Sequence, residues 1–383
     1  MAAAEIDIQK NPVRVMEGCT PRGYCPELDV VRFCAFLLVF IHHNLPHHAS
    51  SNGWLVLTSA ANACGMGLCL FFTLSAYLIT GLLLRERREK TDVSVEKFYV
   101  RRILRIWPLY LVGILVGVIW ALVHHHPHEV TAFLWYLLFA GNVYCASFGW
   151  SGNPMTPLWS ISIEEQFYLV WPWAMRYLTR RGLMLCAAFF ILAANIALYV
   201  LGSHHASTDH TVWANTFVQS EMFATGIILA LSGGGKLRRS AGLGVLLCVI
   251  GPLCWFFACF TFHVKAGDTA MADGAGPLMI GYMLTALGCA AVLYGFTLIG
   301  PSHMPRWAVA LGKISFGLYV YHLLAGAVVR SVFEYFRVAH SSGAGTGLAL
   351  LLTILMAKLS YSLIETPFLR LKRRFELIHS TPI

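Results

Sequence analysis

Apolar stretches of about 20 residues alternate with short polar loops along most of the chain. A helix needs roughly 20 apolar residues to cross a hydrocarbon core about 30 Å thick. The pattern predicts ten membrane-spanning helices, over residues 28–45, 55–84, 103–123, 157–178, 183–201, 212–231, 241–262, 278–299, 307–330 and 345–364. We therefore expect an all-α polytopic membrane protein.

One aromatic stretch, "TAFLWYLLFAGNVY" at residues 131–144, is too short to cross the membrane. Counting it as a span would also move the basic turn at residues 176–182 to the side opposite the other basic loops. We expect this stretch to form one short re-entrant or interfacial segment on the outer side.

The Lys and Arg residues gather in particular loops, and ten crossings place all of these loops on one side of the membrane: 85–105, 176–182, 233–239, 301–306 and 370–374. Cytoplasmic loops are rich in Lys and Arg. Both chain termini then lie in the cytoplasm. The expected organisation is an N-terminal cytoplasmic segment at 1–26, a transmembrane domain at 27–366 and a cytoplasmic tail at 367–383, with Pro367 ending the last helix. The first 26 residues lack the apolar core of a signal peptide.

The composition supports a membrane protein, with 57% hydrophobic and 12% charged residues among 383. The net charge of +9 comes from the basic loops, so it gives no reason to expect a nucleic acid partner. Of the 11 cysteines, nine lie in or beside apolar stretches, and Cys19 and Cys25 lack the spacing of zinc ligands. We expect packing residues rather than disulfides.

The first predicted helix carries Asp29, Arg32, His42 and His43 within an otherwise apolar sequence. At 100° per residue, Asp29, Arg32 and His43 share one stripe, whereas His42 points about 80° away. The rise from Arg32 to His43 is about 16 Å, so the two side chains lie in opposite halves of the membrane. Ionisable residues inside membrane helices usually mark a site or a pathway.

The third predicted helix begins with Arg101, Arg102 and Arg105 at its cytoplasmic end. Guanidinium groups bind phosphate through two parallel hydrogen bonds, so this cluster suits a phosphate ligand. A plain cytoplasmic anchor is the alternative.

The fourth predicted helix enters from the outer side and carries Glu164 and Glu165 roughly 10 Å into the membrane. Ser160 lies one turn before Glu164. Two adjacent acids in a membrane span have two explanations. They form a buried ion pair or hydrogen-bond network, or they tune a catalytic base.

Weaker candidates lie on three other helices. Lys313 begins its helix at the cytoplasmic edge, and His322 follows in the outer half of the same helix. Ser75 lies in the inner half of the second helix, where a hydroxyl also serves to connect helices. A single buried His is often a structural group, and Glu365 near the last helix end is expected to pair with a basic loop.

Histidine-rich outer segments, at residues 45–48, 124–128 and 204–210, raise the question of zinc. These segments lack a ligand spacing on a single helix, so we expect no metal.

Six motifs occur in one order along residues 28–370: "LDVVRFCAFLLVFIHH", "FFTLSAYLITG", "FYVRRILRIWPLY", "LWSISIEEQFYLVWPW", "ISFGLYVYHL" and "ETPFLR". In order and spacing they resemble the membrane acyltransferase-3 family, which includes bacterial O-acetylases of lipopolysaccharide and exopolysaccharide. Two positions depart from the family pattern, because Phe33 and Ala76 stand where the family commonly has Gly.

The resemblance implies transfer of an acyl group from cytoplasmic acyl-CoA, commonly acetyl-CoA, to a hydroxyl of a glycan or natural product at the outer side. It also maps the family motifs onto Arg32 with His43, Arg102 with Arg105, and Ser160 with Glu164, Glu165 and Gln166. The protein is then expected to be a multi-pass enzyme of the bacterial inner membrane whose acceptor is a glycan, a lipid-linked saccharide or a small molecule.

Taken together, these observations predict the roles of individual residues. His43 would act as general base on the acceptor hydroxyl, with Asp29 or a glutamate of the fourth helix orienting it, and an acyl-histidine intermediate is an open alternative. The expected catalytic residues are His43, Glu164, Asp29 and His322. The expected acyl-CoA contacts are Arg32, Arg101, Arg102, Arg105, Ser75 and Lys313.

A second class of protein has the same general pattern. Intramembrane charges also occur in secondary transporters and flippases, where they bind anions or relay protons. The absence of an inverted repeat in this sequence argues against a transporter.

Overall fold

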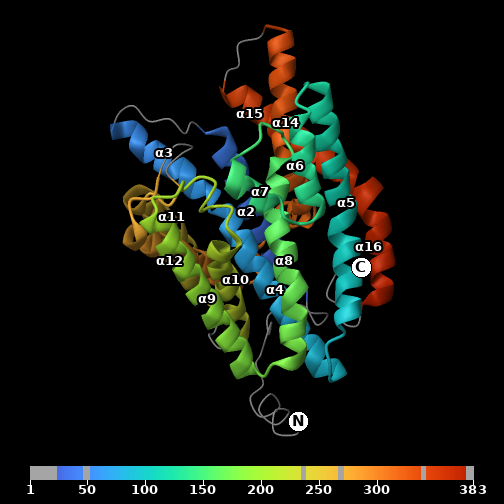
Figure 1. The fold of residues 1–383 in the computed structure, drawn as a ribbon. Helices are drawn as coiled ribbons and strands as arrows, with labels where there is room; N and C mark the ends of the chain where they lie inside the picture. The colour runs from blue at the N-terminus through green and yellow to red at the C-terminus, as the bar shows by residue number, and fades with distance from the viewer. Residues whose placement is uncertain (1–23, 46–51, 234–238, 266–270, 338–341, 377–383) are drawn as a thin grey trace. The chain divides into compact units, whose positions relative to one another are not determined.

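The computed structural model describes residues 24–45, 52–233, 239–265, 271–337 and 342–376 (Figure 1). Within these ranges the regular structure is helical, apart from one isolated bridge between Ser207 and Met271. Predictions for residues 1–23, for His47 and His48 and for the tail beyond residue 376 fall outside the described residues.

The described residues include seven helical segments that are long and apolar enough to cross a membrane: Leu55–Lys90, Val95–Val123, Arg180–Ser203, Ala241–Phe262, Ala275–Ile299, Ser315–Tyr335 and Gly343–Phe375. The protein is therefore a multi-pass, all-α membrane protein. The remaining predicted spans are also helices, α2 (Pro26–Asn44), α8 (Trp159–Tyr177) and α10 (Thr216–Leu231). α2 and α8 are less apolar because each carries three charged residues, and α10 is short, with 16 residues.

The chain forms two compact units, which are considered separately below. Unit 1 comprises the described parts of Met1–Val95 and Phe167–Gly312, and unit 2 comprises Glu96–Gln166 and the described parts of Lys313–Glu376.

Unit 1 is a bundle built around α4 (Gly67–Lys90) and α10, which pack along each other. Figure 1 shows α11 (Ala241–Phe262) and α12 (Ala275–Ile299) side by side, with α9 (Arg180–Ser203) next to them. Aromatic side chains fill the core. The rings of Phe167 and Phe223 stack with centroids 4.4 Å apart, and buried Trp171 donates to Thr80 Oγ1. Membrane helices pack closely where small residues let backbones approach.

Glycines permit two of these close approaches. A Cβ atom on Gly226 of α10 would overlap the carbonyl oxygen of Thr73 in α4, and one on Gly67 would lie 2.5 Å from the carbonyl oxygen of Ala35 in α2. Only a residue without Cβ lets these helices lie so near one another.

The apolar stretch predicted as one helix at 55–84 contains two, α3 (Asn52–Gly65) and α4, separated at Met66. Both helices belong to one candidate span, Leu55–Lys90, so the predicted crossing is confirmed and only the break at Met66, between two glycines, is new. The predicted helix at 307–330 is likewise divided, into α13 (Arg306–Lys313) and α14 (Ser315–Tyr335).

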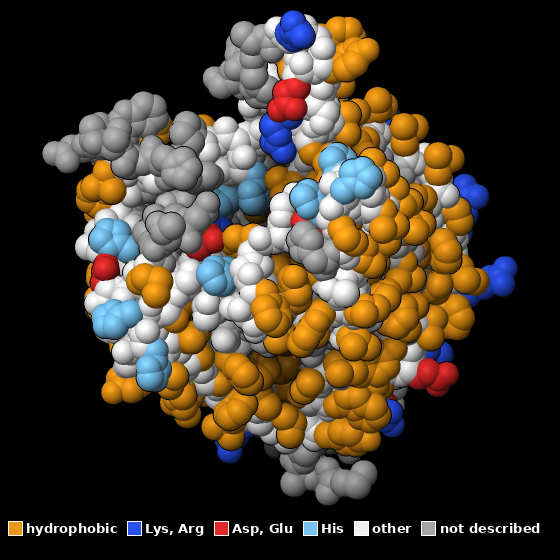
Figure 2. Space-filling model, turned by 45° about the horizontal axis from the view of Figure 1, so that its top comes forward, with side chains coloured by type: hydrophobic (Ala, Val, Ile, Leu, Met, Phe, Trp, Pro, Cys, Tyr) orange, Lys and Arg blue, Asp and Glu red, His pale blue; other side chains and the backbone are white. Residues whose placement is uncertain are grey.

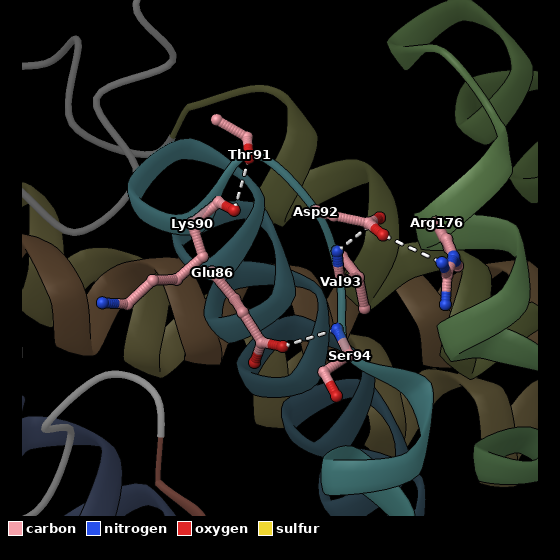
Figure 3. A network of polar contacts seen from close by, with 7 residues as sticks. All are labelled: Glu86, Lys90, Thr91, Asp92, Val93, Ser94 and Arg176. Atoms are coloured by element: carbon pink, nitrogen blue, oxygen red, sulfur yellow. Dashed lines mark hydrogen bonds and ion pairs between the residues drawn. The ribbon is translucent and has the colours of Figure 1, made fainter.

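The basic loop after α4 is held by polar contacts, as Figure 3 shows. Glu86 accepts a hydrogen bond from Ser94 N, and Asp92 forms an ion pair of 3.0 Å with Arg176 near the end of α8. Arg87 also donates to the carbonyl oxygens of Met175 and Leu178. These contacts satisfy carbonyl groups at the end of α8 that lack partners within the helix.

Unit 2 contains α5 (Val95–Val123), the first half of α8, α14 and α15 (Ser342–Ser360), with α14 and α15 packed together (Figure 1). The predicted non-spanning segment at 131–144 forms two short helices, α6 (His128–Leu137) and α7 (Gly141–Phe148). Their lengths of 10 and 8 residues are too small to cross a membrane, as predicted.

The last helix does not end at Pro367. α15 continues through a π-helical turn, Tyr361–Glu365, into α16 (Thr366–Lys372). Proline lacks a backbone N–H, and it fits here because it occupies the first turn of α16. The predicted end of the last helix at Pro367 is therefore wrong, whereas the domain boundary at residue 366 stays a prediction.

The cysteine prediction is wrong at one described position. Cys25 is disulfide-bonded, whereas Cys19 lies outside the described residues. The spacing of the two residues carried no information about pairing.

The surface agrees with a lipid environment. Figure 2 shows a face on which hydrophobic side chains cover broad areas. Exposed leucines project from the candidate spans, for example Leu115 at 58%, Leu185 at 70% and Leu351 at 65% exposure. Such residues are stable at a protein surface that faces hydrocarbon rather than water.

The substitution Gly226→Ala should destabilise unit 1 by about 1–3 kcal/mol, because the added methyl group forces α10 away from α4. Gly242→Ala in α11 is the control, since a Cβ there meets nothing within 4 Å. Thermal unfolding of the purified protein in detergent should show a lower midpoint for the first variant only. Equal midpoints would contradict the close crossing.

Candidate active site

The predicted site residues belong to both units. Unit 1 contains Asp29, Arg32, His43 and Ser75, and unit 2 contains Arg101, Arg102, Arg105, Glu164, Lys313 and His322.

In unit 1, the carboxylate of Asp29 is buried and holds two neighbours. It accepts hydrogen bonds from Tyr24 OH, at 2.6 Å, and from Arg32 Nη1, which is one helical turn further along α2. Burial and the hydrogen bond to Asp29 raise the pKa of Tyr24, so the phenol stays protonated as a donor. Asp29 therefore positions the guanidinium of Arg32.

This arrangement overturns one predicted contact. Asp29 and His43 are fourteen residues apart in the continuous helix α2, which corresponds to about 21 Å along its axis. The expectation that Asp29 orients the His43 ring is therefore wrong for direct contact. Sharing a stripe on a helix does not bring two side chains together when several turns separate them.

The two adjacent histidines of α2 have different surroundings. His42 is buried, and its Nδ1 lies 2.8 Å from the carbonyl oxygen of Ala61 in α3. His43 is exposed, with its ring centroid 5.0 Å from that of His42. The predicted difference in direction is confirmed, since His42 packs against α3 and His43 is exposed.

Sequence reasoning missed Tyr24 and Glu27. Glu27 is 3% exposed and lies in electrostatic range of Asp29, Tyr77 and Arg239. Ser75 is half-buried in α4, two residues before Tyr77. Glu27 comes just before an apolar stretch, where an acidic residue usually marks the exposed first turn of a helix. The sequence therefore carries no sign that this side chain is buried.

In unit 2, the arginines at the start of α5 have separate partners. Arg101 is buried and donates to the carbonyl oxygen of Phe375 at 3.2 Å. The guanidinium of Arg102 lies 5.8 Å from the ring centroid of Phe98 and in electrostatic range of Glu165. Arg105 lies in electrostatic range of Glu365, the partnership with a basic residue that the sequence predicted for this acid. Lys313 is exposed.

The paired acids of α8 differ in their contacts. Glu165 Oε2 accepts a hydrogen bond of 3.4 Å from Trp107 Nε1 of α5. Glu164 lies in electrostatic range of Glu165 and of Tyr319 in α14. This single bond links α8 to α5, and the choice between a structural network and a tuned catalytic base stays a prediction.

The next residue, Gln166, anchors the short helices. Its amide nitrogen donates to the carbonyl oxygen of Phe139 at 2.8 Å and to Asn142 Oδ1 at 2.9 Å. Ser162 Oγ accepts from Gly141 N at 3.2 Å. The start of α8 therefore fixes α6 and α7 through backbone groups that those helices leave open at their ends.

Ser160 belongs to a further network with α14. Its hydroxyl lies 2.7 Å from Tyr319 OH, and both hydroxyls lie within hydrogen-bond distance of the carbonyl oxygen of Pro157. His322 is 1% exposed, and its Nδ1 donates to the carbonyl oxygen of Tyr319 at 2.6 Å. The proton on Nδ1 leaves Nε2 as the nitrogen that can accept a proton. Tyr319, which lies one helical turn before His322, was not among the site residues predicted from the sequence.

The fold and these networks define a multi-pass membrane protein with buried acids, arginines and histidines in its helices. The profile of the acyltransferase-3 family, described as an acyltransferase domain, matches residues 26–363. The chain belongs to this family.

Relatives agree with the family assignment. The chain is 28% identical over 367 residues to a Staphylococcus aureus protein named as an O-acetyltransferase, covering 90% of this chain and 57% of that protein. It is 25% identical over 375 residues to the peptidoglycan O-acetyltransferase OatA of Listeria monocytogenes, covering 90% and 56%. It is 28% identical over 368 residues to YrhL of Bacillus subtilis, named as a peptidoglycan O-acetyltransferase, covering 90% and 55%.

The chain spans little more than half the length of these relatives. No solved structure matches the chain.

Replacing Gln166 by Met should destabilise unit 2 by about 1–3 kcal/mol, because the apolar side chain leaves the acceptors at Phe139 and Asn142 without their donor. Ser362→Ala is a matched control, since that hydroxyl is exposed and bonds only within its own helix, to Leu359 O. Thermal unfolding in detergent measures both variants. A Gln166→Met protein as stable as the control would show that α6 and α7 do not depend on this anchor.

Proposed function

We propose that the protein is an integral membrane O-acetyltransferase. It moves an acetyl group from cytoplasmic acetyl-CoA to a hydroxyl of a glycan at the outer side of a bacterial inner membrane. The observation that carries this proposal is the family match across residues 26–363. The names of the relatives as O-acetyltransferases support the choice of acetyl over other acyl groups.

The proposed topology has ten crossings, cytoplasmic termini and a re-entrant or interfacial α6–α7 segment. Seven candidate spans together with the helices α2, α8 and α10 support this number. The concentration of Lys and Arg in the loops that would be cytoplasmic supports the orientation.

The proposed contacts for the phosphates of acetyl-CoA are the basic residues near the cytoplasmic helix ends. Arg102 and Arg105 supply guanidinium groups from α5, and Arg32 supplies another that Asp29 holds in place. Arg101, Ser75 and Lys313 complete the proposed set. The bond from Arg101 to Phe375 O supports an additional structural role for that residue.

In the proposed reaction, His43 removes the proton from the acceptor hydroxyl while its oxygen attacks the thioester carbonyl carbon. The resulting tetrahedral intermediate then expels the CoA thiolate, which takes the proton from His43, so that the acetyl ester and CoA are released and the imidazole is neutral again. General base catalysis of this kind contributes about 10²- to 10⁴-fold to a rate. Glu164 and His322 are proposed as further catalytic groups, and the tautomer that Tyr319 O imposes on His322 supports a proton-accepting role.

The proposed acceptor is a glycan, either polymeric or lipid-linked. Two relatives are named as peptidoglycan O-acetyltransferases, which supports a glycan over a small natural product. Every acceptor in this group supplies a hydroxyl as nucleophile.

His43→Ala should lower acetyl transfer by at least about 100-fold, because the general base is removed. The control is His42→Gln, which keeps a donor for Ala61 O while changing the neighbouring histidine. Ester-linked acetate on surface glycans should be measured in cells that contain equal amounts of each protein in their membranes.

Full activity of His43→Ala would refute the catalytic assignment. A wild-type protein that moves solutes across vesicle membranes but never transfers acetate would instead be a transporter.

Replacing Arg102 and Arg105 together by Gln should raise KM for acetyl-CoA about 100-fold or more, since charge-assisted hydrogen bonds contribute about 1.5–3 kcal/mol each. Arg88→Gln, at an exposed position in the last turn of α4, should leave KM unchanged. Initial rates of CoA release at varied acetyl-CoA concentrations provide the measurement. An unchanged KM for the double variant would remove both arginines from the donor site.

A further inference from the structure

A buried lysine ends the last helix of unit 2. Only 8% of the Lys372 side chain is exposed, and its Nζ lies 3.3 Å from Glu376 Oε1, which is also buried at 7% exposure. Arg373 and Arg374, the next two residues, are exposed. Exposed Arg and Lys side chains are sufficient to anchor a helix end at a membrane surface. Anchoring therefore does not explain why Lys372 is buried.

The start of α5 lies beside this lysine. Arg101 Nη1 donates to the carbonyl oxygen of Phe375, three residues after Lys372. Arg102 and Arg105 both lie in electrostatic range of Lys372. Two segments almost 270 residues apart in the sequence thus place a lysine next to the arginine pair that resembles the family motif.

Like charges that are partly withdrawn from water repel one another, so such a cluster is costly unless anions balance it. Each cation of this group has a carboxylate in range: Glu165 for Arg102, Glu365 for Arg105 and Glu376 for Lys372. Glu376 differs from the other two because it lies past the end of the helix, after the short turn Arg373–Phe375. Side chains outside regular structure can move without breaking a helix.

We propose that Lys372 is a further phosphate-binding cation of the donor site, beside Arg102 and Arg105, and that Glu376 is its internal counter-ion, which a phosphate of CoA displaces. This inference rests on the proposed function, since it takes acetyl-CoA as the donor. The exchange replaces one anion by another, so Lys372 never becomes an uncompensated charge. The lysine contributes a compact point charge beside two planar guanidinium groups that bind phosphate in pairs of hydrogen bonds.

The test measures the affinity of the purified full-length protein in detergent for CoA, 3′-dephospho-CoA and pantetheine. Lys372→Gln should weaken CoA binding about 10-fold or more, with a smaller loss or none for pantetheine, which carries no phosphate. Lys372→Arg keeps the charge and should retain most of the affinity. Arg374→Gln removes an exposed charge from the same turn and should change no Kd by more than about 2-fold.

Glu376→Gln separates this proposal from a purely structural ion pair. Without the Glu376 carboxylate, a phosphate of CoA no longer competes with an internal anion for Lys372, so CoA should bind several-fold more tightly. CoA should also raise the midpoint of thermal unfolding by more than it does in the wild-type protein. A structural pair predicts the opposite, a less stable protein with unchanged CoA affinity.

Three results would overturn the inference: unchanged CoA affinity in folded Lys372→Gln, equal losses for CoA and pantetheine, or unchanged or weaker CoA binding by Glu376→Gln. A wild-type protein that binds none of the three compounds would overturn the proposed function itself. Loss of phosphate-dependent binding in the arginine double variant but not in Lys372→Gln would leave the proposed function standing and reject only the role of Lys372.

Discussion

A charged side chain inside a membrane-spanning helix must find its partner within the protein, because hydrocarbon supplies none. Three ionisable residues among those that the structure describes illustrate that constraint. Asp29 binds Tyr24 and Arg32, Glu165 accepts from Trp107, and Arg101 donates to a backbone carbonyl near the chain end. These partnerships hold Arg32 and Arg101, two residues of the proposed donor site, in fixed positions.

The constraint also explains where sequence and structure agree. The apolar stretches predicted a polytopic helical protein, and the segment at 131–144 was correctly excluded from the spans because it is short. The different directions of His42 and His43 followed from helix geometry alone. Such features are local, and their period is visible in one stretch of sequence.

The features that sequence reasoning missed depend on contacts between distant segments. Ser160 and Tyr319 are 159 residues apart, and neither sequence motif indicates the other. The division of α3 from α4 at Met66 and the disulfide at Cys25 likewise leave no trace in hydropathy. The error about Asp29 had another cause. Asp29 shares a stripe of α2 with His43 but lies fourteen residues before it, and Arg32, one turn away, is the partner of the carboxylate.

The π-helical turn Tyr361–Glu365 determines which side of α16 each of its side chains points to. A π-helical turn contains one residue more than an α-helical turn, and each residue of an α-helix turns the chain by about 100°. Thr366 Oγ1 fastens the widened turn by donating to the carbonyl oxygen of Tyr361. Removing the surplus residue would turn α16 about its axis by roughly that angle. Its buried lysine would then point toward another side of the helix, away from the arginines of α5.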